Sequence, residues 1–349
     1  MFGKRKKQVV GCDVGSSSIK LVELKPLKND EFQLVHAAIA ELSPEAIVDG
    51  AIMDSSLVVD ALTRLISENG IKNTKFGGSL SGHSVIIKKI QLPSMTEAEL
   101  AESIQWEAEQ YIPFDINDVN LDYVVLDTSG SDTMDVLLVA VKKDRINDYT
   151  SVIVQAGKEP VLVDVDVFAV QNAFESNYSS RGETVALVNV GASVMNINVL
   201  HDGNSVFWRD VAFGGNLYTE AIQREFNLPR EEAEQLKLGG QVGQVSRQQV
   251  DSVLNAASED LAAELQKTID FFVATSSVDR IDRIMLSGGG ALAANLSPIL
   301  QERFQVQVEL LNPFRNIRYN ESDFDPDWIN RNAPAMAVAV GLAIRTVGG

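Results

Sequence analysis

The stretch Gly11-Cys12-Asp13-Val14-Gly15-Ser16-Ser17-Ser18-Ile19-Lys20-Leu21-Val22-Glu23-Leu24 decides the fold of this 349-residue chain. Two apolar segments, 8–15 and 19–24, flank three serines, a pattern typical of a β-hairpin. Residues 186–200 repeat the pattern at a constant offset, so that Asp13, Gly15 and Ser17 correspond to Asn189, Gly191 and Ser193. Because the repeat begins near the middle of the chain, it predicts two copies of one α/β unit.

A third glycine-rich turn follows an apolar strand at 283–286. Ser287-Gly288-Gly289-Gly290 separates this strand from a helical pattern over 291–300. Glycines between a strand and a helix allow a ligand to approach the backbone at the helix N-terminus. Such a turn alone is weak evidence for a ligand site, and the duplicated hairpins strengthen it.

The hairpin residues suit a phosphate ligand. Backbone N–H groups and the serine hydroxyls can hold phosphate oxygens, Lys20 can reach them as a point charge, and Asp13 can hold a hydrated Mg²⁺. Two such hairpins facing each other across a cleft would grip a triphosphate from both sides. Each hairpin taken alone is also compatible with an ordinary surface turn, and the duplication favours the ligand site.

A compact insertion is predicted between the two copies. Its pattern is a strand over 85–92, a helix over 97–112 opened by a Thr96–Glu99 capping box, strands over 123–127 and 134–141, and a helix over 144–155. A strand over 160–166 and a helix over 167–174 lead to the second copy. Helices are predicted there over 216–226, 229–238 and 246–274, and a last apolar helix over 335–347.

Composition excludes several classes of protein. The chain has 48 acidic and 30 basic residues, a net charge of −18, which disfavours nucleic-acid binding. One cysteine and three histidines offer neither a disulfide nor a zinc cluster. The cationic run 4–7 is interpreted as a solvated tail, with weak attraction to anionic lipid as the alternative.

Membrane anchoring is not expected. Asp13 interrupts the first apolar stretch, which argues against a signal peptide, and the apolar run 335–344 is half of the ~20 residues that a span needs. We therefore expect a cytoplasmic protein whose membrane association comes through a partner.

The motifs together resemble the actin-like ATPase fold. The two hairpins and Ser287–Gly290 occur in the order of that fold's phosphate-1, phosphate-2 and adenosine motifs, and 214–216 with 232–237 resembles an adenosine-contacting segment of the division protein FtsA. The narrower similarity, on 1–4, 11–24, 92–95 and 106–114, is to the PilM family of type IV pilus assembly. The chain's end at Gly349, without the membrane helix expected of FtsA, favours this family.

The resemblance implies an α/β fold of two duplicated lobes around a nucleotide cleft, with an FtsA-type inserted subdomain. Its expected boundaries are subdomain 1A at 1–80 and 158–183, the inserted 1C at 81–157, 2A at 184–220 and 281–333, 2B at 221–280, and a C-terminal helix at 334–349 returning to 1A.

The resemblance also implies an adaptor that binds ATP or ADP with Mg²⁺ and holds the N-terminal cytoplasmic peptide of PilN, the inner-membrane partner. Self-association is left open. The implied nucleotide-binding residues are Asp13, Gly15, Ser16, Ser17, Ser18, Lys20, Asn189, Gly191, Ser193, Gly214, Gly215, Glu234, Lys237, Gly288, Gly289 and Gly290, with Asp13 holding Mg²⁺ through water. The implied peptide-binding residues are Gly82, His83, Ser84, Glu99, Ser103, Trp106 and Gln110.

Two departures from the family pattern bear on catalysis. Asn189 stands where hydrolysing relatives carry an aspartate, and an amide cannot accept a proton as a base. Asp166 lies where relatives place a Glu or Gln that orients water, so Asp13 and Asp166 are the catalytic candidates. We expect tight nucleotide binding with at most slow hydrolysis. An FtsA-like filament protein and a small-molecule kinase on the same fold are the alternatives.

Overall fold

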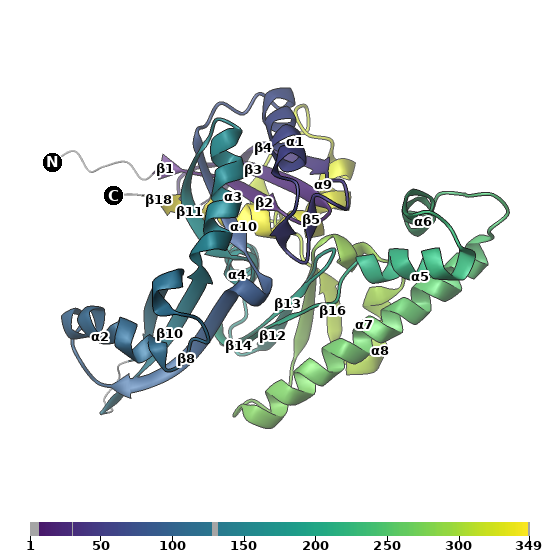
Figure 1. The fold of residues 1–349 in the computed structure, drawn as a ribbon. Coiled ribbons are helices and arrows are strands. Elements are labelled where there is room, and N and C mark those ends of the chain that lie inside the picture. Colours follow the sequence, from purple (N-terminus) through teal and green to yellow (C-terminus); the bar gives the residue numbers. More distant parts are fainter. Residues whose placement is uncertain (1–6, 30, 128–131, 348–349) are drawn as a thin grey trace.

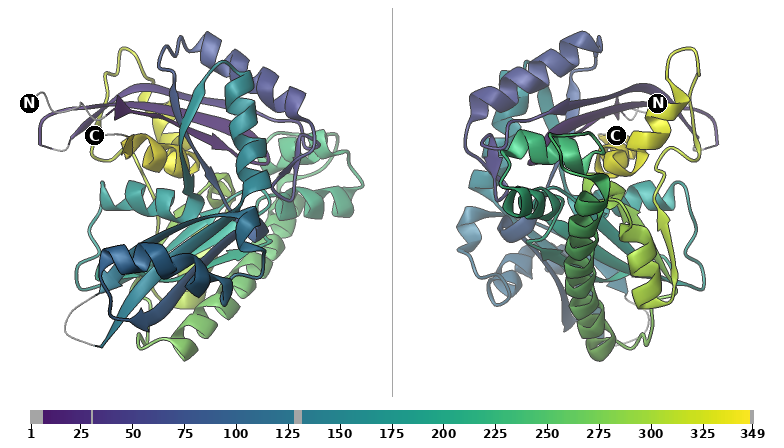
Figure 2. Two further views of the ribbon diagram at one scale, coloured as in Figure 1. Left: turned by 60° about the vertical axis from the view of Figure 1, so that its left-hand side comes forward. Right: turned by 90° about the vertical axis from the view of Figure 1, so that its right-hand side faces the viewer.

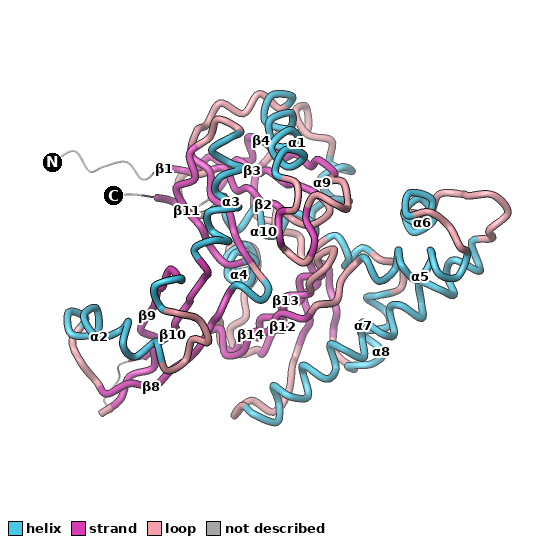
Figure 3. Tube along the Cα trace, viewed as in Figure 1, coloured by secondary structure: helices cyan, strands magenta, loops and turns pink. Residues whose placement is uncertain are grey.

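The computed structural model describes residues 7–29, 31–127 and 132–347. Two large sheets, each covered by helices, form two lobes, and a smaller three-stranded sheet projects from one of them (Figure 1). The predicted cationic run lies outside the described residues except for Lys7, which begins a short strand. Figure 3 shows strands gathered in the interior of each lobe, with the long helices on the outside.

The sheet of the first lobe has the order β11-β7-β2-β3-β4-β17. Strands β2, β3 and β4 form an antiparallel meander, and β7 and β11 add to β2 in parallel. The strand bounds are β2 Val10–Val14, β3 Ser18–Pro26, β4 Phe32–Glu41, β7 Lys75–Leu80, β11 Glu159–Val165 and β17 Ile317–Arg318.

The sheet of the second lobe repeats this arrangement with the order β16-β15-β12-β13-β14. Its β12, β13 and β14 form the antiparallel meander, and β15 and β16 add in parallel. The strand bounds are β12 Thr184–Val190, β13 Met195–His201, β14 Asn204–Val211, β15 Arg283–Ser287 and β16 Gln307–Leu310. The predicted duplication is therefore confirmed for five strands of each sheet.

The helices divide into outer layers and one shared layer. The first lobe carries α1 (Ser55–Glu68) and α3 (Lys143–Gln155) outside, and the second lobe carries α5 (Asn216–Phe226), α6 (Arg230–Lys237), α7 (Arg247–Thr275) and α8 (Leu296–Phe304). Along β12, Ala186 and Val188 face the core shared with the outer helices, whereas Val185 and Leu187 face the opposite core. This alternation is the period of two expected for a strand buried on both faces.

Helices α4 (Asp166–Glu175) and α10 (Ala337–Ile344) form the shared layer between the two sheets. Their backbones touch, since a Cβ on Gly341 of α10 would overlap the carbonyl of Ala169 in α4. Gly11 of β2 meets the carbonyl of Ala339 in the same way. The two lobes are thus joined through a close-packed helix pair, which the views of Figure 2 show from two further sides.

The insertion is the 3₁₀ turn η1 (Gly82–Ser84), β8 (Val85–Pro93), α2 (Glu97–Glu109), β9 (Val119–Asp127) and β10 (Thr133–Lys142). The helix predicted over 144–155 as its last element is α3, which packs in the core of the first lobe instead. The strands form an antiparallel sheet in the order β8-β10-β9, and α2 buries Leu100, Ile104 and Ala108 against it. The insertion connects β7 to α3, so it extends only the first lobe (Figure 1). The corresponding connection of the second lobe, between β15 and α8, holds a short 3₁₀ turn, η3 (Gly289–Leu292).

Three predicted helices differ from the structure. The helix predicted over 97–112 ends at Glu109, and the pattern over 291–300 splits into η3 and α8, because Asn295 adopts a left-handed conformation with φ 64°. The helix predicted over 335–347 begins as a 3₁₀ turn, Ala333–Met336, and ends at Ile344, after which β18 (Thr346–Val347) pairs with β1 (Lys7–Gln8).

The remaining short elements complete the fold. They are β5 (Ile47–Val48), β6 (Ala51–Ile52), the 3₁₀ turns η1 (Gly82–Ser84) and η2 (Ile116–Asp118), and α9 (Pro326–Asn332). In the part of the chain that the structure describes, no helix combines the length and the apolar character that crossing a membrane requires.

Candidate functional site

The first predicted phosphate turn joins β2 to β3. The N–H of Gly15 donates to the carbonyl of Ser18 at 3.1 Å, which closes the turn around the three serines. Asp13 faces Lys20 across the hairpin, and their side chains form an ion pair at 3.1 Å. Both side chains keep about an eighth of their surface exposed, 14% and 13%, so the pair is sheltered but reachable by a ligand.

The second turn, between β12 and β13, has the same geometry. The N–H of Gly191 donates to the carbonyl of Val194 at 2.9 Å, and Asn189 faces Asn196 in the register in which Asp13 faces Lys20. The Asn189 amide donates to Asn196 Oδ1 at 2.9 Å. A neutral amide pair therefore replaces the ion pair of the first copy.

The predicted glycines of the second lobe pack around this turn. A Cβ on Gly214 would lie 2.6 Å from the Gly191 carbonyl, and one on Gly288, whose φ is 85°, would overlap the carbonyl of Val190. Gly290 is equally crowded by Val190, whereas a Cβ on Gly289 would meet open space. The structure thus brings the second and third turns into direct contact, and leaves the backbone of Gly289 accessible.

The segment around α5 and α6 is tied to the second turn by side chains. Asn216 donates to the Ser193 hydroxyl at 3.2 Å and accepts from Arg230 at 2.7 Å. On α6, Lys237 pairs with Glu234 at 2.6 Å, and both contact the Thr219 hydroxyl. Arg230 also pairs with Glu234 at 3.9 Å, so Glu234 and Lys237 lie in one polar network with Ser193. Thr219 and Arg230 were not among the predicted residues, whereas Asn216 belongs to the predicted adenosine-contacting segment 214–216.

Asp166, the first residue of α4, lies near the first turn. Its carboxylate accepts from the Ser79 hydroxyl at 2.5 Å. The residue keeps some accessible surface, but the carboxylate is densely surrounded by protein. This desolvation, with the negative charge of Asp13 as the second cause, raises the pKa of Asp166 to about 6. The two predicted catalytic residues are thus close enough to interact electrostatically.

Asp210 on β14 is a site residue that the sequence analysis missed. It accepts from the Asn196 amide at 2.8 Å and from the backbone N–H of Gly82 at 2.6 Å. Asn196 could have been found from the sequence, because the repeat offset maps Lys20 onto it. Asp210 and Ser79 carry no such pattern, since their positions depend on strands paired far apart in the chain.

The predicted peptide-binding residues occupy two segments of the insertion. Gly82, His83 and Ser84 form η1, directly before β8, and Glu99, Ser103, Trp106 and Gln110 lie along α2 and its C-cap. Trp106 is 71% exposed. Glu99 has a structural role, because its carboxylate accepts from the backbone N–H and the hydroxyl of Thr96 and completes the capping box at the start of α2.

The residues around the turns fit a nucleotide. The exposed Ser17, the sheltered Lys20 and the open backbone at Gly289 are donors suited to phosphate oxygens. Within the described ranges, no group of three or more His, Cys, Asp or Glu side chains is placed to hold a metal ion. Asp13 could contact a Mg²⁺ held mainly by phosphates and water, which is the way this ion is commonly bound.

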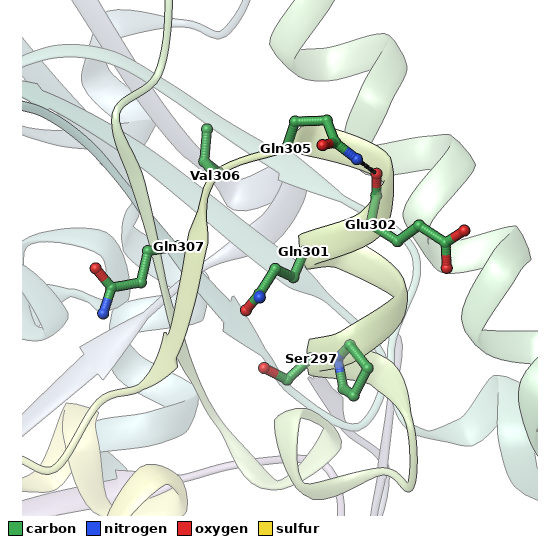
Figure 4. Close-up of a pocket in the computed structure, with 7 residues that line it drawn as sticks. Ser297, Gln301, Glu302, Gln305, Val306 and Gln307 are labelled. Atoms are coloured by element: carbon green, nitrogen blue, oxygen red, sulfur yellow. Dashed lines mark hydrogen bonds between the residues drawn. The ribbon is translucent and has the colours of Figure 1, made fainter.

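A surface hollow lies away from the three glycine-containing turns. Figure 4 shows it between α8 and β16, lined mostly by polar side chains: Ser297, Pro298, Gln301, Glu302, Gln305, Val306 and Gln307. None of these residues belongs to the turns, and the hollow has no charged group buried within it. It is not part of the candidate site.

Comparisons with known proteins match nearly the whole chain. A family model described as "Type IV pilus assembly protein PilM" matches residues 11–347. A solved PilM–PilN type IV pilus biogenesis complex contains a chain 26% identical to this one, with a TM-score of 0.87 over 98% of this chain and 99% of that chain.

More distant structures share the fold alone. The ethanolamine utilization protein EutJ from Carboxydothermus hydrogenoformans is 13% identical, with a TM-score of 0.59 over 98% of this chain and 90% of that chain. MreB5 of Spiroplasma citri bound to AMPPNP is 14% identical, with a TM-score of 0.51 over 97% of this chain and 95% of that chain. The predicted actin-like ATPase fold is confirmed.

Proposed function

The chain belongs to the PilM family of type IV pilus assembly proteins, and from that premise we propose that it is a nucleotide-binding adaptor. In this proposal it holds ATP or ADP between its two lobes and the N-terminal cytoplasmic peptide of a PilN on its insertion. The observation that carries the nucleotide half is the matched pair of turns at Gly15 and Gly191, each closed by the same kind of hydrogen bond. Three serine hydroxyls follow Gly15, and one, that of Ser193, follows Gly191.

Phosphate groups would lie between the two turns. In the proposed bound state, Lys20 turns from Asp13 to the phosphates, and Asp13 contacts a Mg²⁺ through water. The base and ribose would lie toward Gly214, Gly289 and the polar network of α6. Bound Mg²⁺ would supply charge neutralisation at the phosphates, and the protein residues would bind and orient them.

Hydrolysis is proposed to be slow. Asn189 is held by its bonds with Asn196 and Ser287, and its amide brings no negative charge and no proton acceptor to the site. Asp166 is the carboxylate proposed to orient a water molecule, and the Ser79 hydroxyl fixes one of its oxygens. Slow turnover suits a protein whose bound nucleotide organises a partner site.

The peptide half of the proposal is supported by the insertion and by the family. The related solved structure is a complex with PilN, and the insertion presents Trp106 and η1 at its surface. A cytoplasmic chain that binds a peptide of an inner-membrane protein would gain its membrane location from that partner.

The nucleotide proposal is tested by titrating a fluorescent ATP analogue with Mg²⁺ into the wild type, Asp13→Ala, Lys20→Ala and, as a control, Lys72→Ala. Lys72 is an exposed lysine of the same lobe. We expect Lys20→Ala to weaken binding by at least tenfold, which corresponds to about 1.4 kcal/mol. Lys72→Ala should bind like the wild type. Equal binding by all four proteins would contradict the proposed site.

The peptide proposal is tested by calorimetry with a synthetic cognate PilN N-terminal peptide. Binding by the wild type, weakened by Trp106→Ala or Ser84→Trp, supports the insertion as the peptide site. If the peptide binds and neither variant weakens it, the peptide lies elsewhere. Absence of binding with and without ATP·Mg²⁺ would overturn the adaptor function.

A further inference from the structure

We propose that β14 of the second lobe clasps the root of the insertion and couples the nucleotide site to the peptide site. The clasp consists of Trp208 and Asp210 with their hydrogen-bond partners in the insertion. This inference rests on the proposed function, because it assigns a means of communication between the two binding sites.

Two hydrogen bonds form the clasp. The indole Nε1 of Trp208 donates to the carbonyl of Ile87 at 2.9 Å, and Asp210 Oδ2 accepts from the N–H of Gly82 at 2.6 Å. Trp208 and Asp210 are two residues apart on one strand, so both side chains project from the same face of β14. The insertion is covalently part of the first lobe, yet it is also hydrogen-bonded to the second.

A chain of side chains leads from the clasp to the nucleotide turns. The second carboxylate oxygen of Asp210 accepts from Asn196 at 2.8 Å, Asn196 accepts from Asn189 at 2.9 Å, and Asn189 accepts from the Ser287 hydroxyl at 3.2 Å. Ser287 directly precedes the three glycines. Each amide donates toward Asp210 and accepts from the nucleotide side, so the orientation of every member fixes the next.

The clasp is sensitive to the relative position of the lobes. The Gly82 side of the contact moves with the first lobe, which carries Lys20, and the Asp210 side moves with the second, which carries Gly191 and Gly289. A nucleotide held by both lobes would fix their separation and with it the clasp. The carboxylates of Asp166, at the start of α4, and Asp210 carry like charges and repel each other weakly at this point.

The route ends at residues already proposed for the peptide. Gly82 begins η1, and Ile87 lies in β8, which starts one residue after η1. Strand β14 contacts η1 as well as β8 through these bonds, so a change in the clasp moves the predicted peptide-binding loop directly. Gly82, in the predicted peptide-binding loop, donates directly to Asp210, which is also the last member of the side-chain network from the nucleotide turns. No further residues are therefore needed to connect the two sites.

The test compares peptide affinity with and without ATP·Mg²⁺ in the wild type, Asp210→Ala, Trp208→Phe and, as a control, Val206→Ala. Val206 is an exposed residue of the same strand that makes neither clasp bond. We expect the wild-type affinity to change by at least about fivefold with nucleotide. Both clasp variants should reduce this ratio to within about twofold of one, and Val206→Ala should keep it.

Each outcome decides between the proposals. A wild-type ratio of one, or an unchanged ratio in Asp210→Ala and Trp208→Phe, overturns the clasp while leaving nucleotide and peptide binding intact. Failure of the wild type to bind either ligand overturns the proposed function itself.

Amide hydrogen exchange over 82–93 gives a second measurement that needs no peptide. If Asp210→Ala is poorly folded, Trp208→Phe provides the comparison, because it removes one hydrogen bond and keeps an aromatic ring. We expect faster exchange in this segment in the clasp variants, and slowing by ATP·Mg²⁺ in the wild type only. Equal slowing in the variants would contradict the proposal.

Discussion

At the scale of single residues, one of the differences between the two copies of the hairpin changes the charge of the site. Asp13 with Lys20 and Asn189 with Asn196 occupy the same cross-strand register. The first pair carries opposite charges near the surface, whereas Asn189 and Asn196 are buried and neutral. In the proposed function, the hairpin of the first lobe would bring charged side chains to the phosphates, and the hairpin of the second lobe would bring neutral hydrogen-bonding groups.

Asp166 predicts a pH dependence of stability. Its folded-state pKa, about 6, lies above the ordinary value of 3.8, so the native state binds the proton more tightly than the unfolded state. The resulting stabilisation is present below pH 4 and is lost as the pH rises toward 6. Asp166→Asn removes this titration, so the variant should gain stability relative to the wild type between pH 4 and pH 7.

Urea unfolding at several pH values measures that gain, which should reach about 1 to 3 kcal/mol at neutral pH. Asp279→Asn, at an exposed position, is the control and should follow the wild type throughout. A difference between Asp166→Asn and the wild type that stays constant from pH 4 to pH 7 would show that the carboxylate keeps an ordinary pKa.

At the scale of elements, the contact between α4 and α10 depends on a glycine. Any side chain at Gly341 would overlap the Ala169 carbonyl, so Gly341→Ala must push the helices apart. We expect a loss of about 3 kcal/mol or more, by the overpacking of a close backbone contact. Thermal unfolding followed by circular dichroism measures it.

The matched control is Gly78→Ala in β7. A Cβ there would lie 3.7 Å from Ile153, an ordinary van der Waals distance, and the backbone needs no left-handed conformation. This variant should unfold within a few degrees of the wild type. Similar losses of stability in Gly341→Ala and Gly78→Ala would mean that the destabilisation does not come from the close contact between α4 and α10.

Element types were predictable from local patterns, and their ends were less so. The long helix of the second half was predicted over 246–274 and runs over Arg247–Thr275, because a capping box and an apolar stripe specify it. The helix after the glycine turn was misplaced, since the left-handed Asn295 interrupts a pattern that looks continuous. Over the short apolar run near the C-terminus, an α-helix and a 3₁₀ turn have the same sequence pattern, so the turn at Ala333–Met336 could not be separated from α10.

The candidate site, too, was predictable from the sequence only in part. The turns follow from the repeat and could be predicted residue by residue, together with Asn189 and Lys20. Ser79, Asp210 and Trp208 could not, because each is placed by pairing between strands or lobes that lie far apart in the sequence. Local sequence carries no record of such contacts.

At the scale of the whole molecule, the hydrophobic cores predict which parts unfold together. The core around α4 and α10 takes residues from both halves of the chain, including Leu187, whereas the insertion has a core of its own around Leu138. Leu187→Ala should therefore destabilise both lobes, by about 2 to 5 kcal/mol, and Leu138→Ala should destabilise the insertion alone.

Hydrogen exchange resolved along the sequence separates the two cases. Both leucines are 1% exposed, so each variant removes a comparable amount of buried surface. Leu138→Ala should raise exchange over 85–142 and leave β12 protected. Loss of protection in β12 as well would show that the insertion and the lobes form one cooperative unit.

The close contact between Gly341 of α10 and Ala169 of α4 also bears on how the two lobes can move relative to each other. Backbone packed directly against backbone resists sliding, so we expect any rotation of one lobe against the other to leave this contact nearly unchanged. In such a rotation, an element is displaced more the farther it lies from this contact. The insertion and α6, which lie toward opposite sides of the molecule in Figure 1, would therefore move farther than the elements packed beside α4 and α10.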